Sequence, residues 1–574
     1  MNRSKTNSKF PELAEALRDV RHYFGFAALF SAAVNLLMLT PIIYMLQVYD
    51  RVVASGSVPT LTMLTILMVC LLLSMGGFEW VRSMVMIAAS NRLEQRLRQR
   101  VADATFNRAL LSGGMTTSAQ PMNDLSQLRQ FLTGSSLFAF FDAPWVPVYI
   151  FVMYLFHPYF ALAGVIAVII MLALTLANEK TTSPKLQDAN SLNSAVNNQL
   201  TGTLRNAEVI AAMGMGKDIR ARQEDGSERI MDLQSTASRQ AGAFTSLSKA
   251  LRITMQSLTL GLGALLALQQ QISPGMMIAG SLLLGRALAP IDLLVNTWRG
   301  FSVARAQYRR LGELLEQLPE RQPPMRLPTP QGRLTVENLF VRPPPPAQTN
   351  VVINANFELS PGEALGVVGP SASGKSSLAR AILGVWPSAG GAVRLDGAEI
   401  FTWDREQLGP HVGYLPQDIE LFDGSIADNI CRFGGQDTEA IVAAAQLAGV
   451  HDLILTLPNG YNTLIGGAGG VLSGGQRQRI GLARAVYGNP CLIVLDEPNS
   501  NLDDQGEREL VEALDRIKQR GSTVIVISHR TMVLQSMDKM LVLKDGRTAS
   551  YGPRAQVLAS LMKPAAKLPQ SAAR

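Results

Sequence analysis

Nine consecutive residues near position 370 combine glycines, hydroxyls and one lysine in an order that suits phosphate binding. Glycines let successive backbone N–H groups turn toward phosphate oxygens, and a following helix adds the positive end of its dipole. The lysine can reach the β- and γ-phosphates of a nucleotide, and the serine after it can ligate Mg²⁺. An ordinary turn with a solvated lysine is the alternative, and the full motif disfavours it. The nine residues are Gly369, Pro370, Ser371, Ala372, Ser373, Gly374, Lys375, Ser376 and Ser377.

The elements that would position this loop are visible on both sides of it. An apolar strand is predicted at 364–368 and a helix at 377–383, which is the context a phosphate-binding loop requires. A second apolar strand, 492–495, leads directly into Asp496 and Glu497. Because a carboxylate that ends a buried strand is held rigidly, Asp496 is suited to orienting Mg²⁺ or its water shell.

A third motif, Leu472-Ser473-Gly474-Gly475-Gln476, lies between these two. Taken alone it would more often be an ordinary turn. At this spacing from the other two motifs, however, the C-terminal third of the chain resembles the ATP-binding cassette (ABC) family. The resemblance implies that the motif caps the γ-phosphate of an ATP held by the phosphate loop of a partner copy.

The same resemblance implies roles for the remaining ATPase residues. Glu497 matches the general base that polarises the attacking water, and a glutamate here predicts hydrolytic competence. His529, after the predicted strand 523–527, matches the histidine that contacts the γ-phosphate. The implied catalytic set is Glu497, His529, Lys375 and Gln417, the metal set is Ser376, Gln417 and Asp496, and the nucleotide contacts are 369–377, Ser473, Gly474, Gly475, Gln476 and Asp503.

One departure from the family concerns the adenine base. ABC ATPases usually place an aromatic ring under adenine just after the first strand of the cassette. The aligned position in this chain falls near Pro343, after Phe340. We therefore expect no aromatic stacking at that position and loose selectivity between nucleotides.

Composition and hydropathy predict a membrane domain before the cassette. The chain has 574 residues, of which 47% are hydrophobic and 17% charged, and the apolar excess lies before residue 300. About 20 apolar residues span the ~30 Å hydrocarbon core of a bilayer. The weaker stretches could be buried helices of a soluble domain, but three strong neighbours argue against that reading. Six stretches qualify, namely 24–46, 58–78, 137–156, 159–177, 244–268 and 273–295.

The basic residues predict how these spans are oriented. Lysines and arginines concentrate in the N-terminal segment and in the long connections after the second and fourth spans, whereas the alternate connections are very short. The positive-inside rule therefore places the N-terminus and the ATPase in the cytoplasm. This topology accounts for the net charge of +7, so a nucleic-acid partner is not expected. Helical periodicity at 91–110 and 189–222 indicates that spanning helices continue beyond the membrane.

Together these features predict an α-helical membrane domain of six transmembrane helices followed by an α/β P-loop domain. The resemblance to the ABC family implies that the first is in the type I ABC exporter fold and that the second is an ABC nucleotide-binding domain. None of the three cysteines has disulfide or metal-ligand spacing. The expected divisions are a cytoplasmic N-terminal segment 1–22, the membrane domain 23–315, a Pro-rich linker 316–332, the ATPase 333–562 and a disordered tail 563–574.

Two stretches of the membrane half carry a narrower resemblance. Tyr44–Val52 and Phe141–Tyr149, continuing to Pro158, look like the inner-membrane ATPase of bacterial type I secretion. The most similar subgroup exports metalloproteases, lipases and haemophores. The resemblance implies a homodimer in the lipid of a Gram-negative inner membrane, with a periplasmic membrane-fusion adaptor and a TolC-like outer-membrane channel. With ATP and Mg²⁺ as its cofactors, it would use ATP hydrolysis to export an unfolded protein with a C-terminal signal.

Two other functions are weighed against protein export. An exporter or flippase of lipids or small molecules could use the same frame, whereas a soluble ABC ATPase of DNA repair or translation is contradicted by the spans. Arg286, Asp292 and Asp142 are candidates for lining the transport route, because charges within spans usually face a cavity or a partner. Arg286 is expected to face the dimer axis or to pair with an acid of another helix, and a purely structural pairing is equally consistent.

Overall fold

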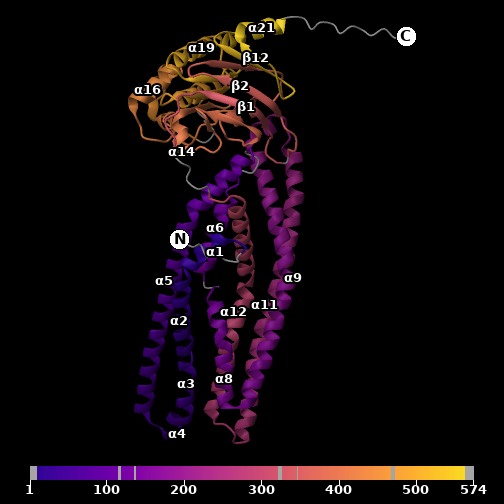
Figure 1. The fold of residues 1–574 in the computed structure, drawn as a ribbon. Coiled ribbons are helices and arrows are strands. Elements are labelled where there is room, and N and C mark those ends of the chain that lie inside the picture. The colour runs from indigo at the N-terminus through magenta and orange to yellow at the C-terminus, as the bar shows by residue number, and fades with distance from the viewer. Residues whose placement is uncertain are drawn as a thin grey trace, which may run out of the picture. The chain divides into compact units, whose positions relative to one another are not determined.

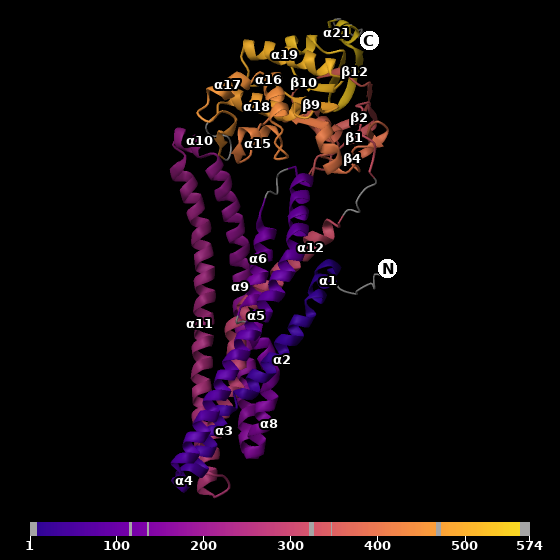
Figure 2. The same ribbon diagram turned by 90° about the vertical axis from the view of Figure 1, so that its left-hand side faces the viewer.

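The structure is a computed structural model that describes residues 9–113, 118–134, 137–320, 326–345, 347–466 and 472–562. The chain separates into two compact units. The helical unit comprises the residues up to Thr105 with Ser118–Pro319, and the sheet unit comprises Phe106–Thr117 with the residues from Glu320 onward. Figures 1 and 2 show the elements of both units. The expected disordered tail 563–574 lies outside the described residues.

The described residues of the helical unit form helices and the short connections between them. Among the residues that the structure describes, six segments are long and apolar enough to cross a membrane, so the six predicted spans are confirmed: Arg21–Ser55, Val58–Leu111, Phe138–Phe156, Pro158–Leu204, Gly216–Leu268 and Pro274–Val295. The elements are α1 Pro11–Asp19, α2 Arg21–Leu37, α3 Thr40–Gln47, a π-helical turn Val48–Val52, α4 Val53–Ser55, α5 Val58–Leu111, α6 Gln120–Thr133, α7 Phe138–Asp142, a 3₁₀ turn Ala143–Trp145, α8 Val146–Phe156, α9 Pro158–Arg205, α10 Ala207–Ala212, α11 Gly216–Leu268 and α12 Pro274–Gln317.

Several of these helices are much longer than a membrane span. At 1.5 Å per residue, the 54 residues of α5 extend about 80 Å, against a hydrocarbon core of ~30 Å. The predicted continuation over 91–110 is therefore confirmed. The predicted helical stretch 189–222 is interrupted, because α9 ends at Arg205 and a turn at Met213–Met215 separates α10 from α11. α9 and α11 run side by side along most of their length (Figures 1 and 2).

Two apolar clusters hold the helical unit together. One joins α1, α2, α5, α6 and α12, and the other joins α3, α8, α9, α11 and α12. Buried residues of α5 recur every three or four positions, which gives one apolar face to the helix. Its span 58–78 has no buried side chain, as expected of a surface that faces lipid. α12 belongs to both clusters and so connects them.

The described part of the sheet unit forms three sheets with strand orders β2-β1-β4-β5, β12-β11-β3-β10-β9-β6 and β7-β8. Its strands are β1 Leu334–Val341, β2 Val352–Leu359, β3 Ala364–Val368, β4 Ser388–Leu395, β5 Ala398–Glu399, β6 Val412–Leu415, β7 Gly424–Ser425, β8 Leu464–Ile465, β9 Leu492–Asp496, β10 Thr523–Ile527, β11 Lys539–Lys544 and β12 Arg547–Pro553. Its helices are α13 Lys375–Ile382, α14 Arg405–Leu408, α15 Ile426–Ile430, α16 Thr438–Leu447, α17 His451–Thr456, α18 Gly474–Val486, α19 Asp504–Gln519, α20 Thr531–Gln535 and α21 Arg554–Met562.

The six-stranded sheet is covered on both faces, which explains its uninterrupted apolar strands. Successive side chains of β9 alternate between two cores, as strand geometry requires. Ile493 and Leu495 pack in the core formed with α15, α16, α18 and α19. Leu492 and Val494 pack in the core formed with α13 and the antiparallel sheet. Since every residue of β9 is buried, the strand fixes the position of Asp496 at its end.

Parallel pairing brings four strand ends to one edge. β3 pairs with β10, β10 with β9, and β9 with β6, all in parallel. Ile527 is opposite Asp496 and Leu415 is opposite Leu495, so these strands end level with each other. Ligands of open α/β sheets bind at this carboxyl edge. Most of the residues predicted to do chemistry lie at the ends of these four strands or directly after them.

Candidate active site

The loop between β3 and α13 is shaped by close backbone approaches. Gly374, at the N-cap of α13, has φ 94°, and a Cβ there would lie 2.6 Å from the carbonyl oxygen of Val351. A Cβ on Gly369 would collide with the carbonyl oxygen of Leu543. These two glycines therefore allow a curvature that a side chain would prevent. α13 begins at Lys375, two residues earlier than predicted, so Lys375 and Ser376 belong to its first turn.

Lys375 lies inside the curve of this loop. Its Nζ donates hydrogen bonds of 2.8 Å to the carbonyl oxygens of Gly369 and Pro370. Burial lowers the pKa of Lys375, and the carboxylates of Glu497 and Asp496 oppose that shift. Ser373 Oγ is also buried and has no hydrogen-bond partner among the described residues. The loop thus offers a cation and a free hydroxyl to an oxygen-rich anion, which fits phosphate.

Asp496 and Ser376 form a donor set that fits Mg²⁺. Asp496 is 2% exposed, and its Oδ1 has no partner within the part of the chain that the structure describes. Burial raises the pKa of Asp496, whereas the Ser376 hydroxyl, which hydrogen-bonds the carboxylate, and the cations Arg380 and Lys375 act against this. The described residues include no cluster of three His, Cys, Asp or Glu side chains able to hold a metal. A cation here would therefore need further oxygens from a nucleotide.

Glu497 has the strained backbone that is common at functional sites. Its φ is 50°, a left-handed conformation that costs a non-glycine residue about 1–3 kcal/mol. Its backbone N–H donates to the Ile527 carbonyl oxygen at 2.9 Å, which ties it to the end of β10. Gln417 Nε2 donates to Glu497 Oε2 at 2.9 Å. The structure thus joins Gln417 to the predicted base, whereas the assignment of Gln417 to the metal stays a prediction.

His529 follows β10 at the same edge. Its side chain is exposed, while the preceding Ser528 is buried and donates to Asn499 Oδ1 at 2.9 Å. Because Ile527 is opposite Asp496, His529 lies beside the strand that leads to Glu497. Its contact with the γ-phosphate stays a prediction.

The residues Ser473, Gly474, Gly475 and Gln476 form the N-terminus of α18. Ser473 Oγ accepts from the backbone N–H of Gln476, and Gln476 Oε1 accepts from the backbone N–H of Ser473 at 2.8 Å, which makes a capping box. A Cβ on Gly475 would lie 2.8 Å from the Asn501 carbonyl oxygen. An exposed serine at a helix N-terminus suits an anion. That the anion is ATP bound to a second copy stays a prediction.

Asp503 is placed differently from the other predicted nucleotide contacts. Its Oδ1 accepts a hydrogen bond of 2.9 Å from the backbone N–H of Gly506, so it caps the N-terminus of α19. This role stabilises the loop 500–503 that precedes the helix. Its proposed share in nucleotide binding stays a prediction.

Gln478, which is 2% exposed on α18, is a further residue of the site that was not predicted from the sequence. Its Nε2 donates to the Glu497 carbonyl oxygen at 3.3 Å, and its Oε1 accepts from the Asn501 backbone N–H at 2.9 Å. The residue therefore connects the helix after the third motif with the predicted base. A signal was present in the sequence, because Gln478 begins the apolar face that continues with Leu482 and Val486.

Pro343 stands at the aligned position where ABC ATPases usually place an aromatic ring under adenine. Phe340 is opposite Gly390 in the β1–β4 ladder, and its ring would contact a Cβ on Gly390. Arg342 is exposed and donates to Asn350 Oδ1 at 3.3 Å, and Pro343 follows it. The loose nucleotide selectivity inferred from Pro343 stays a prediction.

Two of the three charged candidates in the spans are paired. Asp142 Oδ1 accepts a hydrogen bond of 2.8 Å from Asn35 Nδ2 and lies 3.1 Å from Nη1 of the buried Arg82, with which it forms an ion pair. Asp292 pairs with Arg252 at 2.6 Å. These contacts favour a structural role for the two acids. Arg286 is exposed and forms no ion pair with a described residue, so a position at the dimer axis stays a proposal for it.

Comparisons with known proteins agree with this geometry. Residues 24–289 match the family model described as the ABC transporter transmembrane region, and residues 352–500 match the ABC transporter model. The "Type I secretion system ATP-binding protein PrsD" of Rhizobium meliloti (strain 1021) is 46% identical over 552 residues, which covers 96% of this chain and 95% of that protein.

Two more distant similarities extend the comparison. The "Leukotoxin translocation ATP-binding protein LktB" of Mannheimia glucosida is 29% identical over 540 residues, covering 91% of this chain and 74% of that protein. The solved structure of a bacterial Atm1-family ABC exporter with ATP bound superposes with a TM-score of 0.79 at 21% identity, covering 95% of this chain and 97% of that one. At this identity the superposition shows a shared fold and nothing more.

Proposed function

This chain belongs to the ABC transporters, in the group of type I secretion ATPases, and we propose that it hydrolyses ATP to export a protein across the bacterial inner membrane. The observation that carries this proposal is the 46% identity to a type I secretion ATP-binding protein over nearly the whole of both chains. The assembled carboxyl edge of the six-stranded sheet supplies the chemistry, and the six spanning segments supply the route.

The residues at this edge divide the work of phosphoryl transfer to water. Backbone N–H groups of the loop 369–374 and Lys375 hold the phosphate charge. Glu497 accepts a proton from water as the water oxygen bonds to the γ-phosphorus and the bond to the β–γ bridging oxygen breaks, giving ADP and phosphate. Gln417, bonded to Glu497 Oε2, positions that carboxylate. Ser376 and Asp496 would hold Mg²⁺, which would neutralise charge on the phosphates.

Two copies of the chain complete each site in this proposal. ATP would lie between Lys375 and Ser376 of one copy and Ser473 and Gly475 of the other. Closure on ATP would rearrange the spanning helices, and hydrolysis would reopen them. Both sites of a homodimer would be active, because each copy carries the full set of residues.

The cargo we propose is an unfolded protein with a C-terminal secretion signal, of the metalloprotease or lipase class. The relative from Mannheimia glucosida is named for leukotoxin translocation, which supports a protein cargo over a lipid. A periplasmic adaptor and a TolC-like outer-membrane channel would continue the route to the medium. The N-terminus and the sheet unit would lie in the cytoplasm, where ATP is available.

A secretion assay tests this function. The chain is expressed in a Gram-negative host with its adaptor and channel, together with a protease that keeps or lacks its C-terminal signal. We expect the protease in the medium only when the signal, this chain and both partners are present. Retention of the protease in every case, with ATP hydrolysis stimulated by added lipid or small molecules, would contradict protein export and favour a flippase.

A further inference from the structure

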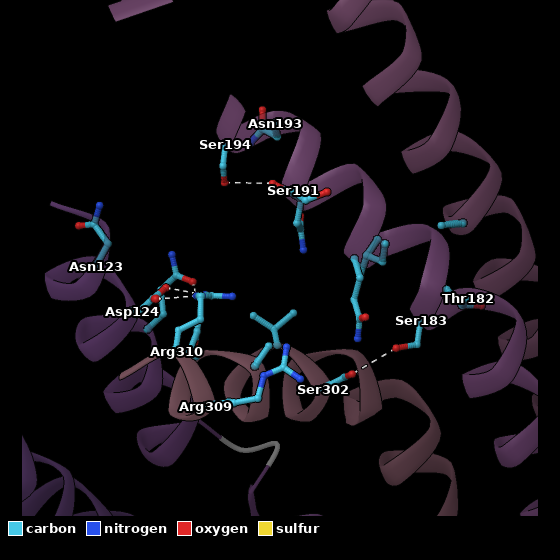
Figure 3. Close-up of a pocket in the computed structure, with 18 of the residues that line it drawn as sticks. Asn123, Asp124, Thr182, Ser183, Ser191, Asn193, Ser194, Ser302, Arg309 and Arg310 are labelled. Carbon is cyan, nitrogen blue, oxygen red and sulfur yellow. Dashed lines mark hydrogen bonds and ion pairs between the residues drawn. The ribbon is translucent and has the colours of Figure 1, made fainter. Parts of the chain in front are cut away.

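The helical unit contains a large cavity outside the ATPase site. Its volume is about 1150 Å³, which exceeds the ~300–1,000 Å³ typical of small-molecule sites. Its walls are parts of α6, α9, α11 and α12, all within residues 118–310. Figure 3 shows labelled side chains of α6, α9 and α12 around one open space.

Most of the residues that line this cavity are neutral and polar. More than half of the lining residues carry a carboxamide or a hydroxyl. The lining charges balance, because Asp124 and Glu179 are matched by Arg309 and Arg310. Asp124 and Arg310 also bind each other through two hydrogen bonds of 2.7 and 2.8 Å (Figure 3). The carboxamides include Asn123, Gln127, Asn178, Asn190, Asn193 and Asn197.

One face of α9 presents a series of these amides. Asn190, Asn193 and Asn197 follow each other at spacings of three and four residues, so they share a face of the helix. All three side chains are exposed, and their amide groups make no hydrogen bond to a described residue. Each amide has two donors and an acceptor oxygen available.

The facing wall belongs to α12. Trp298 lies in this wall, and its indole Nε1–H is buried without a hydrogen-bond partner among the described residues. Nearby, a hydrogen bond of 3.3 Å between Ser183 Oγ of α9 and Ser302 Oγ of α12 connects the two walls (Figure 3).

We propose that this cavity binds an extended segment of the exported polypeptide through its peptide groups. Amides and hydroxyls can satisfy both the N–H and the C=O of a main chain whatever its side chains are. The balanced charge prevents selection by charge. The inference rests on the proposed protein export and names the part of the cargo that is recognised.

Peptide binding to the full chain in nanodiscs tests the proposal without ATP. The ligand is a fluorescent, uncharged peptide of Gly, Ser and Ala, compared with the same peptide N-methylated at alternate residues. N-methylation removes backbone N–H donors at alternate residues and leaves every carbonyl oxygen in place. We expect the methylated peptide to bind the unaltered protein at least ten-fold more weakly, since its methylated residues cannot donate hydrogen bonds to the amide oxygens. Equal binding of the two peptides, or displacement of both by a fluorescent phospholipid, would overturn the proposal.

A variant set places the binding on the α9 face. Replacing Asn190, Asn193 and Asn197 together by leucine should weaken the parent peptide about ten-fold and abolish its preference over the methylated one. Gln199→Leu is the matched control, because Gln199 is an exposed amide of the same helix outside the cavity, and we expect it to bind as the unaltered chain. Equal weakening by the control would overturn the assignment.

The secretion assay separates the failure of this inference from failure of the proposed function. Signal-dependent secretion with no difference between the two peptides would remove the cavity from the route and leave protein export standing. Absence of secretion by the unaltered chain would remove protein export itself, whatever the peptides do.

Discussion

The phosphate loop of the sheet unit and the amide-lined cavity of the helical unit bind in opposite ways. The loop is small, carries a buried lysine and allows no side chain at Gly369 or Gly374. The cavity is wide, its charges balance, and its polar groups come from four helices. The loop suits one ligand of fixed shape, whereas the cavity suits a ligand whose sequence changes as it passes.

This contrast explains why one site is recognisable in the sequence and the other is not. A ligand of fixed shape requires particular residues at fixed spacing, and such spacing is a motif. A distributed lining requires only a kind of side chain at many positions. Its sign is an excess of amides on one helical face, which is common in solvated helices.

The largest effect is expected from replacing Glu497, the residue predicted to accept a proton from the attacking water. Glu497→Gln removes the proton acceptor, so steady-state phosphate release should fall about 10²- to 10⁴-fold while ATP still binds. Phosphate release and nucleotide affinity are measured on the purified chain. Hydrolysis within a few-fold of the unaltered chain would assign the base to another residue and break the loop side of the comparison.

Asp496→Asn tests the cost of a charge held beside the phosphate loop. Turnover should fall about 100-fold, because the carboxylate that fits Mg²⁺ is lost. Burial raises the pKa of Asp496 in the folded state, so the ionised carboxyl destabilises the nucleotide-free protein as pH rises through that pKa. The variant should therefore have the higher unfolding temperature at neutral pH, and the difference should shrink as pH is lowered. A lower unfolding temperature at neutral pH would contradict this account.

Gln478→Leu sharpens the comparison by altering the support of the base and none of the predicted nucleotide contacts. Loss of its bonds to the Glu497 and Asn501 backbones should reduce kcat about ten-fold with little change in KM. Gln505→Leu, an exposed glutamine on α19, serves as the control and should behave as the unaltered chain. A rise in KM at constant kcat would instead indicate direct nucleotide contact.

The features that could be predicted from the sequence differ between the two units for physical reasons. The spans, the P-loop and the pair Asp496–Glu497 follow from apolar runs and local spacing, and the structure brings the last two to one edge. The break after Arg205 and the start of α13 at Lys375 depend on turn geometry, which the periodicity does not record. Asp142 and Asp292 were predicted as candidates for lining the transport route. The arginines that pair with them, Arg82 and Arg252, lie far away in the sequence, so these ion pairs could not be read from local spacing.

The smallest effect is expected at the base of the nucleotide. With Pro343 where an aromatic ring is usual, neither base gains the roughly 1–3 kcal/mol that stacking contributes. Binding is then left mainly to the phosphates, which both nucleotides share, so GTP and ATP should support hydrolysis with kcat/KM values within about five-fold of each other. Competition between the two nucleotides measures this ratio. Strong preference for ATP would show that another group recognises adenine and that the loop site is more selective than its motif indicates.

One cross-linking experiment tests the ATPase site, the cavity and the cargo together. A photo-crosslinking amino acid is placed at Asn193, inside the cavity, or at Gln199, outside it, in cells that contain the adaptor, the channel and the Glu497→Gln form of the chain. Arrested transport should leave cargo cross-linked from position 193 and not from position 199, and only when the cargo keeps its C-terminal signal. Cross-links to lipid alone at position 193, or cargo captured equally from both positions, would contradict the account.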